Sequence, residues 1–103
     1  MIVRELLSPR SIAVVGASNA TAKPGGKVVA NLLAHGYEGS VYPVNPKEET
    51  IQGLPVFASV ADLPQTELAI LAIPAASCHE AVATLAERKG TRAFIVLSAG
   101  FSE

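Results

Sequence analysis

Residues 12–19 of the chain read IAVVGASN, a short apolar run followed at once by a glycine and by small or polar residues. The run from Ile12 to Val15 is too short for a buried helix, and its β-branched residues favour a strand that is buried on both faces. Three further runs rich in Val, Ile or Leu are bounded by turn-forming residues. They predict three more buried strands, over Val41–Val44, Leu68–Ile73 and Ala93–Leu97.

Segments with helical spacing separate these runs. Lys27–His35 has apolar residues three and four apart, and Gly36 then suits the left-handed end of a helix. Ser77–Lys89 is a second helix, because Ser77 and Glu80 have the spacing of a capping box and Gly90 follows the basic last turn.

Two shorter helices are also expected. Ser59–Asp62 begins with a capping serine and is ended by Pro64, which predicts a helix of one or two turns. Ile2–Leu7 has the composition of a short helix in front of the first strand.

Strands and helices therefore alternate, and no tight hairpin signal joins neighbouring strands. This order favours parallel strands with right-handed crossovers. We predict an α/β, Rossmann-like fold of three layers, with a mostly parallel sheet of at least four strands.

Composition restricts the function. A chain of 103 residues that is 50% hydrophobic corresponds to one folded domain. Its net charge of −1 and five aromatic residues, Tyr 2 and Phe 3, argue against a nucleic-acid-binding surface. The single cysteine, Cys78, forms no internal disulfide, and no apolar run reaches the length of a membrane span, so we expect a cytoplasmic protein away from the membrane.

The loop after the first strand is a candidate ligand site. In open α/β sheets ligands bind beyond the carboxyl ends of the strands, and the start of the next helix favours phosphate. Gly16 and Ala17 allow close approach, while Ser18 and Asn19 offer side-chain donors. The same residues also suit a purely structural turn. The loop lacks the G-x-G-x-x-G dinucleotide pattern, since Ser18 stands where that pattern has its second glycine.

The second strand is followed by Asn45, Pro46 and Lys47, where an NAD-binding domain would place a carboxylate for the ribose hydroxyls. A lysine there suits an additional phosphate instead. Alternatively, Lys47 is a solvated charge beside Glu48 and Glu49. Small or rigid residues also follow the third and fourth strands, at Pro74, Ala75 and 98–100.

The blocks quoted above, together with 53–56, resemble the CoA-binding domain of the NDP-forming acyl-CoA synthetase superfamily. This superfamily includes the α chain of succinyl-CoA ligase, ADP-forming acetate–CoA ligases and synthetase-like protein lysine acetyltransferases. The resemblance runs from about Leu6 to Glu103.

The resemblance implies coenzyme A as the ligand. It assigns the CoA phosphates to Gly16, Ala17, Ser18 and Asn19, with Gly26 as the glycine that starts the helix. It places a nucleotide phosphate at Lys47, beside Asn45 and Pro46. The remaining CoA path would be lined by Ile73, Pro74, Ala75, Leu97, Ser98 and Ala99.

No residue is a candidate for catalysis or for binding a metal. The family passes phosphate through a histidine of a later domain, whereas His35 and His79 are expected to be structural, Cys78 to be a packed residue, and Lys23 and Lys27 stay unassigned. Residues 1–103 are therefore expected to be the CoA-binding, N-terminal part of a larger acid–CoA ligase or protein acetyltransferase, with other synthetase domains as partners. An NADP-binding redox domain and a regulatory Rossmann domain are the alternatives.

Overall fold

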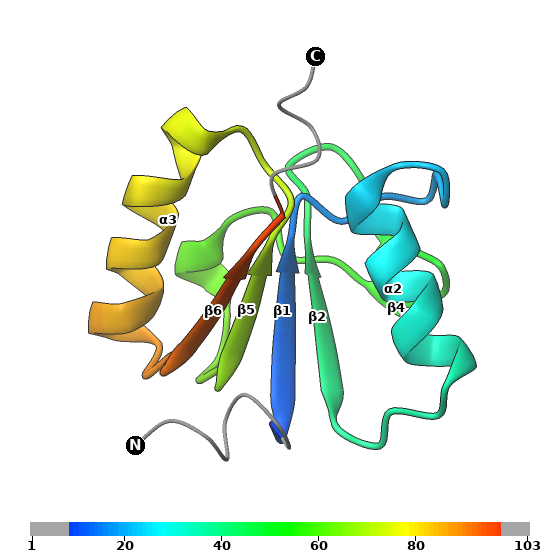
Figure 1. Ribbon diagram of the computed structural model, residues 1–103, viewed down its shortest axis with the longest axis horizontal. Coiled ribbons are helices and arrows are strands. Elements are labelled where there is room, and N and C mark those ends of the chain that lie inside the picture. Colours follow the sequence, from blue (N-terminus) through cyan, green and yellow to red (C-terminus); the bar gives the residue numbers. More distant parts are fainter. Residues whose placement is uncertain (1–8, 98–103) are drawn as a thin grey trace.

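The computed structural model describes residues 9–97 as an α/β domain (Figure 1). Four parallel strands form the main sheet in the order β2-β1-β5-β6, and a small antiparallel hairpin, β3–β4, lies outside it. In chain order the elements are β1 (Ser11–Val15), α2 (Pro24–Ala34), β2 (Ser40–Val44), β3 (Thr50–Ile51), β4 (Leu54–Pro55), η1 (Val60–Asp62), β5 (Leu68–Leu71), α3 (Ala75–Arg88) and β6 (Ala93–Val96).

The sheet is the middle of three layers. Alternate residues of β1 point to opposite faces, as in any strand. On one face Ile12 and Val14 pack with Val29 of α2, and on the other Ala13 and Val15 pack with Leu85 of α3. The short helix η1 lies on the α3 side, and the β3–β4 hairpin packs on the α2 side through Ile51 and Leu54. The predicted three-layer, mostly parallel fold is confirmed.

The expectation of four fully buried strands is wrong for two of them. Every residue of β1 and β5 is buried, because each pairs with a strand on both sides. β2 and β6 are the outer strands of this sheet, and their burial is incomplete. In β6 the side chains of Ile95 and Val96 are 37% and 49% exposed. An apolar run shows that a strand forms, but it does not show where the strand lies in the sheet.

The predicted helix ends are confirmed, whereas the helix starts need correction. Gly36 and Gly90 follow α2 and α3 with positive φ values of 70° and 65°. α2 begins at Pro24, ahead of the predicted Lys27, since proline suits the first turn of a helix.

The capping box of α3 is not formed. α3 begins at Ala75 with Pro74 as its N-cap, so Ser77 lies inside the first turn and donates its N–H to the Pro74 carbonyl. By contrast, Ser59 caps η1 as predicted, and its hydroxyl accepts from the N–H of Ala61. The helix expected over Ile2–Leu7 lies outside the described residues.

The β3–β4 hairpin corrects the expectation that no tight hairpin occurs. Its central residues, Gln52 and Gly53, have φ values of 52° and 86°, and a type I′ turn requires positive φ at both positions. Two-residue strands are too short to show alternation, and glutamine is not among the residues that usually signal this turn. No helix within residues 9–97 is long and apolar enough to cross a membrane.

Candidate functional site

The carboxyl ends of all four parallel strands meet at one edge of the sheet, which is the upper edge in Figure 1. Backbone hydrogen bonds join the residues just beyond these ends. The N–H of Gly16 donates to the Val44 carbonyl (3.1 Å), and that of Ala72 donates to Val15 (2.8 Å). On the far side Leu97 donates to Leu71 (2.9 Å). The strand ends that the sequence singled out are thus brought together.

Three glycines pack the first loop, residues 16–23, against its neighbours. Gly16 has a φ of 88°, and a Cβ at this position would lie 2.9 Å from Cγ2 of Ile73. Cβ atoms on Gly25 and Gly26 would overlap the carbonyl oxygens of Gly16 and Ala20. Gly26 was predicted to contact the ligand. In the structure, Gly26 has a packing role, because α2 can approach the loop this closely only where residue 26 has no side chain.

The first turn of α2 has no side-chain cap. Lys23 is the N-cap, and within residues 9–97 no side chain caps the N–H groups that follow it. Pro24 has no N–H, which leaves those of Gly25 and Gly26 to face the loop. The positive end of the helix dipole lies at the same place. This arrangement suits an anion.

The β3–β4 hairpin is hydrogen-bonded to the first loop. Asn19 Nδ2 donates to the Thr50 carbonyl (3.0 Å) and more weakly to Glu48 Oε1 (3.4 Å), while its Oδ1 accepts from the Gln52 N–H (2.8 Å). Asn19 was predicted to offer a donor to the ligand, but its side chain binds the hairpin. The Ser18 hydroxyl accepts from the N–H of Ala20 (2.9 Å).

Gln52 is a residue that the sequence analysis missed. Its Nε2 donates to the carbonyls of Ser18 (3.0 Å) and Gly26 (2.9 Å), so one side chain joins the first loop to the start of α2. Only the dipeptide Gln52-Gly53 could have pointed to a turn here, and nothing in the sequence indicates where the Gln52 side chain would reach.

Asn45 joins the loop after β2 to the first loop. Its Nδ2 donates to the Ala17 carbonyl (2.9 Å), and its Oδ1 accepts from the Lys47 N–H (2.7 Å). Both polar atoms of the predicted ligand residue Asn45 are therefore used within the protein. Pro46 and Lys47 are exposed beside it. No ion pair joins Lys47 to a carboxylate in the part of the chain that the structure describes.

The turn after β5 is short and apolar. Pro74 caps α3, Ala75 is its first residue, and Ile73 contacts Gly16 of the first loop. Cys78 is half-buried, packs in the core on the α3 side and points its Sγ towards the Pro74 carbonyl (3.6 Å). Leu97 packs against the core on the α2 side. The predicted site residues Ser98 and Ala99 lie outside the described residues.

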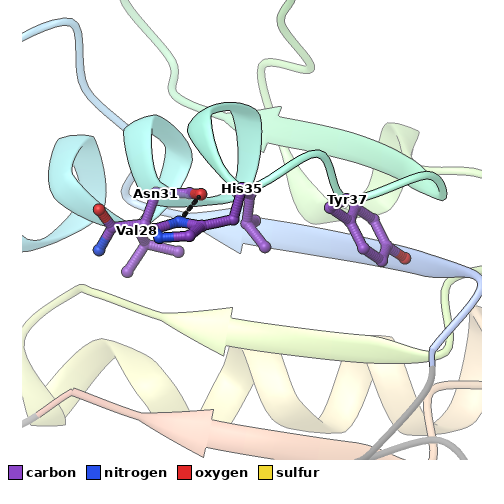
Figure 2. A pocket seen from close by; sticks show the side chains of 5 residues that line it. Val28, Asn31, His35 and Tyr37 are labelled. Carbon is purple, nitrogen blue, oxygen red and sulfur yellow. Dashed lines mark hydrogen bonds between the residues drawn. The ribbon is translucent and has the colours of Figure 1, made fainter.

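A separate groove of about 460 Å³ lies along α2, away from this edge (Figure 2). It is lined by Val28, Asn31, Leu32, His35 and Tyr37. His35 caps α2, and its Nδ1 lies 2.8 Å from the Asn31 carbonyl, which agrees with the structural role expected for it. His79 is exposed in α3, and residues 9–97 contain no cluster of potential metal ligands.

Comparison with known proteins decides the family. Residues 10–103 match the family described as CoA binding domain. The chain belongs to this CoA-binding domain family. The resemblance found in the sequence is confirmed, and coenzyme A is the ligand of the domain.

Several relatives of this CoA-binding domain are ADP-forming acetate–CoA ligases. It is 41% identical over 102 residues to ADP-forming acetate–CoA ligase II of Archaeoglobus fulgidus, covering 98% of this chain and 15% of that protein. It is 39% identical over 97 residues to the α subunit of the corresponding ligase II of Pyrococcus furiosus, covering 93% of this chain and 21% of the subunit. The domain thus spans a small part of each relative.

A solved structure supports the same assignment. Dinucleotide-forming acetyl-coenzyme A synthetase 1 of Ca. Korarchaeum cryptofilum, determined with phosphate and ADP, matches with a TM-score of 0.87 and 32% identity. The match covers 98% of this chain and 22% of the synthetase.

Proposed function

We propose that this domain holds CoA across the carboxyl edge of its sheet, with the phosphates at the first loop and the pantetheine arm along the ends of β5 and β6. The uncapped first turn of α2 beside Ser18 supports the phosphate position. In this arrangement Gly16, Ala17, Ser18 and Asn19 form the phosphate loop. The arm would pass Ile73, Pro74, Ala75, Leu97, Ser98 and Ala99.

The single observation that carries the proposal is the place of Lys47. Asn45 bonds both to Ala17 of the first loop and to the Lys47 backbone, which brings the lysine to the edge of the phosphate loop. Lys47 has no carboxylate partner within residues 9–97, and so its charge is available to an anion. CoA carries a 3′-phosphate on its ribose besides the pyrophosphate. We assign that phosphate to Lys47.

Calorimetric titration with CoA, dephospho-CoA, NADP and NAD tests this function. We expect CoA to bind most tightly and dephospho-CoA to bind more weakly, because it lacks the 3′-phosphate. Tight NADP binding with no response to CoA would contradict the proposal and support a redox domain. No response to any of the four would point to a regulatory domain that has kept the fold without the ligand.

For the whole protein we propose an acid–CoA ligase in which this domain positions the CoA thiol for an acyl phosphate supplied by other domains. The overall reaction joins an acid, CoA and a nucleoside triphosphate to give acyl-CoA, a nucleoside diphosphate and phosphate. We place this reaction in the cytoplasm, since the fold needs no disulfide. A synthetase-like protein acetyltransferase is the second candidate. The full-length protein should release ADP and phosphate when given acetate, CoA and ATP, whereas release of AMP and pyrophosphate would contradict a ligase of this type.

A further inference from the structure

The Gln52 side chain joins the proposed phosphate loop to the first turn of α2. Its amide nitrogen carries two hydrogens, and each is donated to a backbone carbonyl, at Ser18 in the loop and at Gly26 in the first turn of α2. Since both partners are acceptors, only the amide nitrogen can occupy this position. One planar group therefore holds these two segments at a fixed separation.

The Gln52 backbone is also held by the first loop, through the side chain of Asn19. Its N–H donates to Asn19 Oδ1, and Asn19 Nδ2 donates to the carbonyl of Thr50. The contacts between the loop and the hairpin are therefore reciprocal. The Asn19 side chain bonds to the hairpin backbone, and the Gln52 side chain bonds to the loop backbone. We call this pair of side chains, Asn19 and Gln52, the clamp.

The backbone conformation of the turn does not favour glutamine. Gln52 has a φ of 52°, a left-handed conformation that asparagine, aspartate and glycine adopt more readily. Asparagine would suit the turn and still carry an amide, but its side chain is one methylene shorter. Glutamine at this position therefore provides a side chain long enough to bond to the loop, although it is less suited to the turn. A strained residue of this kind is commonly found where the strain serves function.

We infer that Gln52 is a positioning residue for CoA: it holds the phosphate loop and the first turn of α2 in the geometry that receives the phosphates. The inference rests on the proposed function. Gln52 itself touches no ligand in this scheme, because both of its amide hydrogens are already donated. Its contribution is that the loop is ordered before CoA arrives, and less ordering entropy is lost on binding.

Three variants of the chain test the inference. Gln52→Glu keeps the shape and removes the donor, so a carboxylate would face two carbonyl oxygens. Gln52→Asn relieves the turn and shortens the reach. Gln65→Glu is the matched control, because Gln65 donates to the Arg88 carbonyl (3.3 Å) at the end of α3, away from the loop. CoA and pantetheine affinities, melting temperature and amide hydrogen exchange are measured for each.

Gln52→Glu should weaken CoA binding by about tenfold, because the loop must then be ordered when CoA binds. Pantetheine has no phosphates, so its affinity should not change. Gln52→Asn should weaken CoA binding while its melting temperature stays at or above that of the original chain, a combination that a purely structural role would not produce. Gln65→Glu should leave CoA binding unchanged.

Hydrogen exchange tests the clamp without any ligand. The N–H of Ala20, bonded to Ser18 Oγ, and that of Lys23, bonded to the Ala20 carbonyl, should exchange faster in both Gln52 variants. Unchanged exchange, or faster exchange with unchanged CoA affinity, would overturn the inference. If the original chain fails to bind CoA, the proposed function is wrong, and hydrogen exchange still decides whether Gln52 holds the loop.

Discussion

The two turns that lead from a strand into a helix at the carboxyl edge are built differently. The turn between β1 and α2, residues 16–23, is long, contains glycine at its start, and is hydrogen-bonded to the β3–β4 hairpin. The turn between β5 and α3, residues 72–74, is short and apolar, and among the described residues no hairpin bonds to it. Neither helix has a side-chain cap at its start.

This difference suits the two turns to different parts of a ligand bound at the carboxyl edge of the sheet. A helix start without a cap can receive an anion. Within residues 9–97, the β1–α2 turn has the Ser18 hydroxyl in it and is bonded through Asn45 to the segment that carries Lys47. The β5–α3 turn offers an apolar rim at Ile73 and Pro74 instead. In our proposal the charged and uncharged parts of CoA are divided between these turns accordingly.

The largest effect should come from filling the glycine contact beneath the β1–α2 turn. A Cβ on Gly25 would overlap the Gly16 carbonyl, and the atoms around it are backbone that cannot turn aside. We expect Gly25→Ala to lower the free energy of unfolding by about 3 kcal/mol, the upper range for overpacking, and to abolish CoA binding. Urea unfolding measures this.

The corresponding position at the start of α3 is Ala76, which is the second residue of α3 as Gly25 is of α2, and Ala76→Gly changes an exposed first turn. It should lower the free energy of unfolding by at most about 1 kcal/mol through backbone entropy. Equal losses at the two positions would show that the turns do not differ in packing.

Removing the Asn45 side chain should have the next largest effect. Asn45→Ala leaves the Ala17 carbonyl and the Lys47 N–H without their partners, which should lower the free energy of unfolding by about 1–2 kcal/mol. CoA affinity should fall as well, because Lys47 is no longer held beside the first loop. Asn31→Ala, on the exposed side of α2, is the control: it should leave CoA affinity unchanged and should not lower the free energy of unfolding, since alanine favours a helix. An Asn45 variant that matches this control would exclude the positioning role.

Lys47→Ala tests whether the charged part of CoA binds near the β1–α2 turn. We expect CoA binding to weaken by about 1.5-fold to fivefold, as for an exposed charge pair, with little change for dephospho-CoA. Arg92→Ala removes the same charge at the opposite end of the sheet and should leave both affinities unchanged. The assignment of the 3′-phosphate is wrong if Lys47→Ala weakens both ligands equally or neither of them.

The smallest effect on the site is expected from Tyr37, whose hydroxyl donates to the Pro9 carbonyl (2.7 Å) below the sheet. Burial, helped by the Glu67 carboxylate and by Tyr42, raises the pKa of Tyr37 above its ordinary value of 10.0. From about pH 10 upward the unfolded chain therefore loses this proton before the folded chain does, and stability falls as the pH rises.

Tyr37→Phe should remove about 1 kcal/mol of stability at pH 7, the contribution of one hydrogen bond, and leave CoA affinity unchanged. The difference between the two chains should then shrink above pH 10, since phenylalanine does not titrate. Urea midpoints between pH 7 and pH 11 measure both effects. A difference that stays constant to pH 11 would contradict the raised pKa.

The sequence predicts the fold well where one local signal decides it. The apolar runs of β1 and β5 and the glycines after α2 and α3 suffice for the strands, the helix ends and the parallel order. The exposure of β6 could not be predicted, because it depends on which strands lie beside it. The capping box at Ser77 failed because Pro74 already provides the start of α3.

The sequence predicts which loops meet at the edge of the sheet, but it does not predict their side-chain contacts. Strand ends meet at one edge by topology alone, so the residues after β1 and β2 were correctly expected to lie together. The directions of side chains depend on tertiary contacts. The side chains of Asn19 and Asn45 bond to other loops of the protein. Gln52 bonds to the first loop from the β3–β4 hairpin, whose two-residue strands are too short to be recognised in the sequence.

The central claim is that the phosphates of CoA bind at the β1–α2 turn. Amide chemical shifts recorded while CoA is added test it most directly. We predict that the largest shifts occur at Ser18, Gly25 and Gly26, that Lys47 follows, and that dephospho-CoA reproduces all of these except the shift at Lys47. If the largest shifts lie instead along the α2 groove at Val28 and Tyr37, with the β1–α2 turn unaffected, the account is wrong.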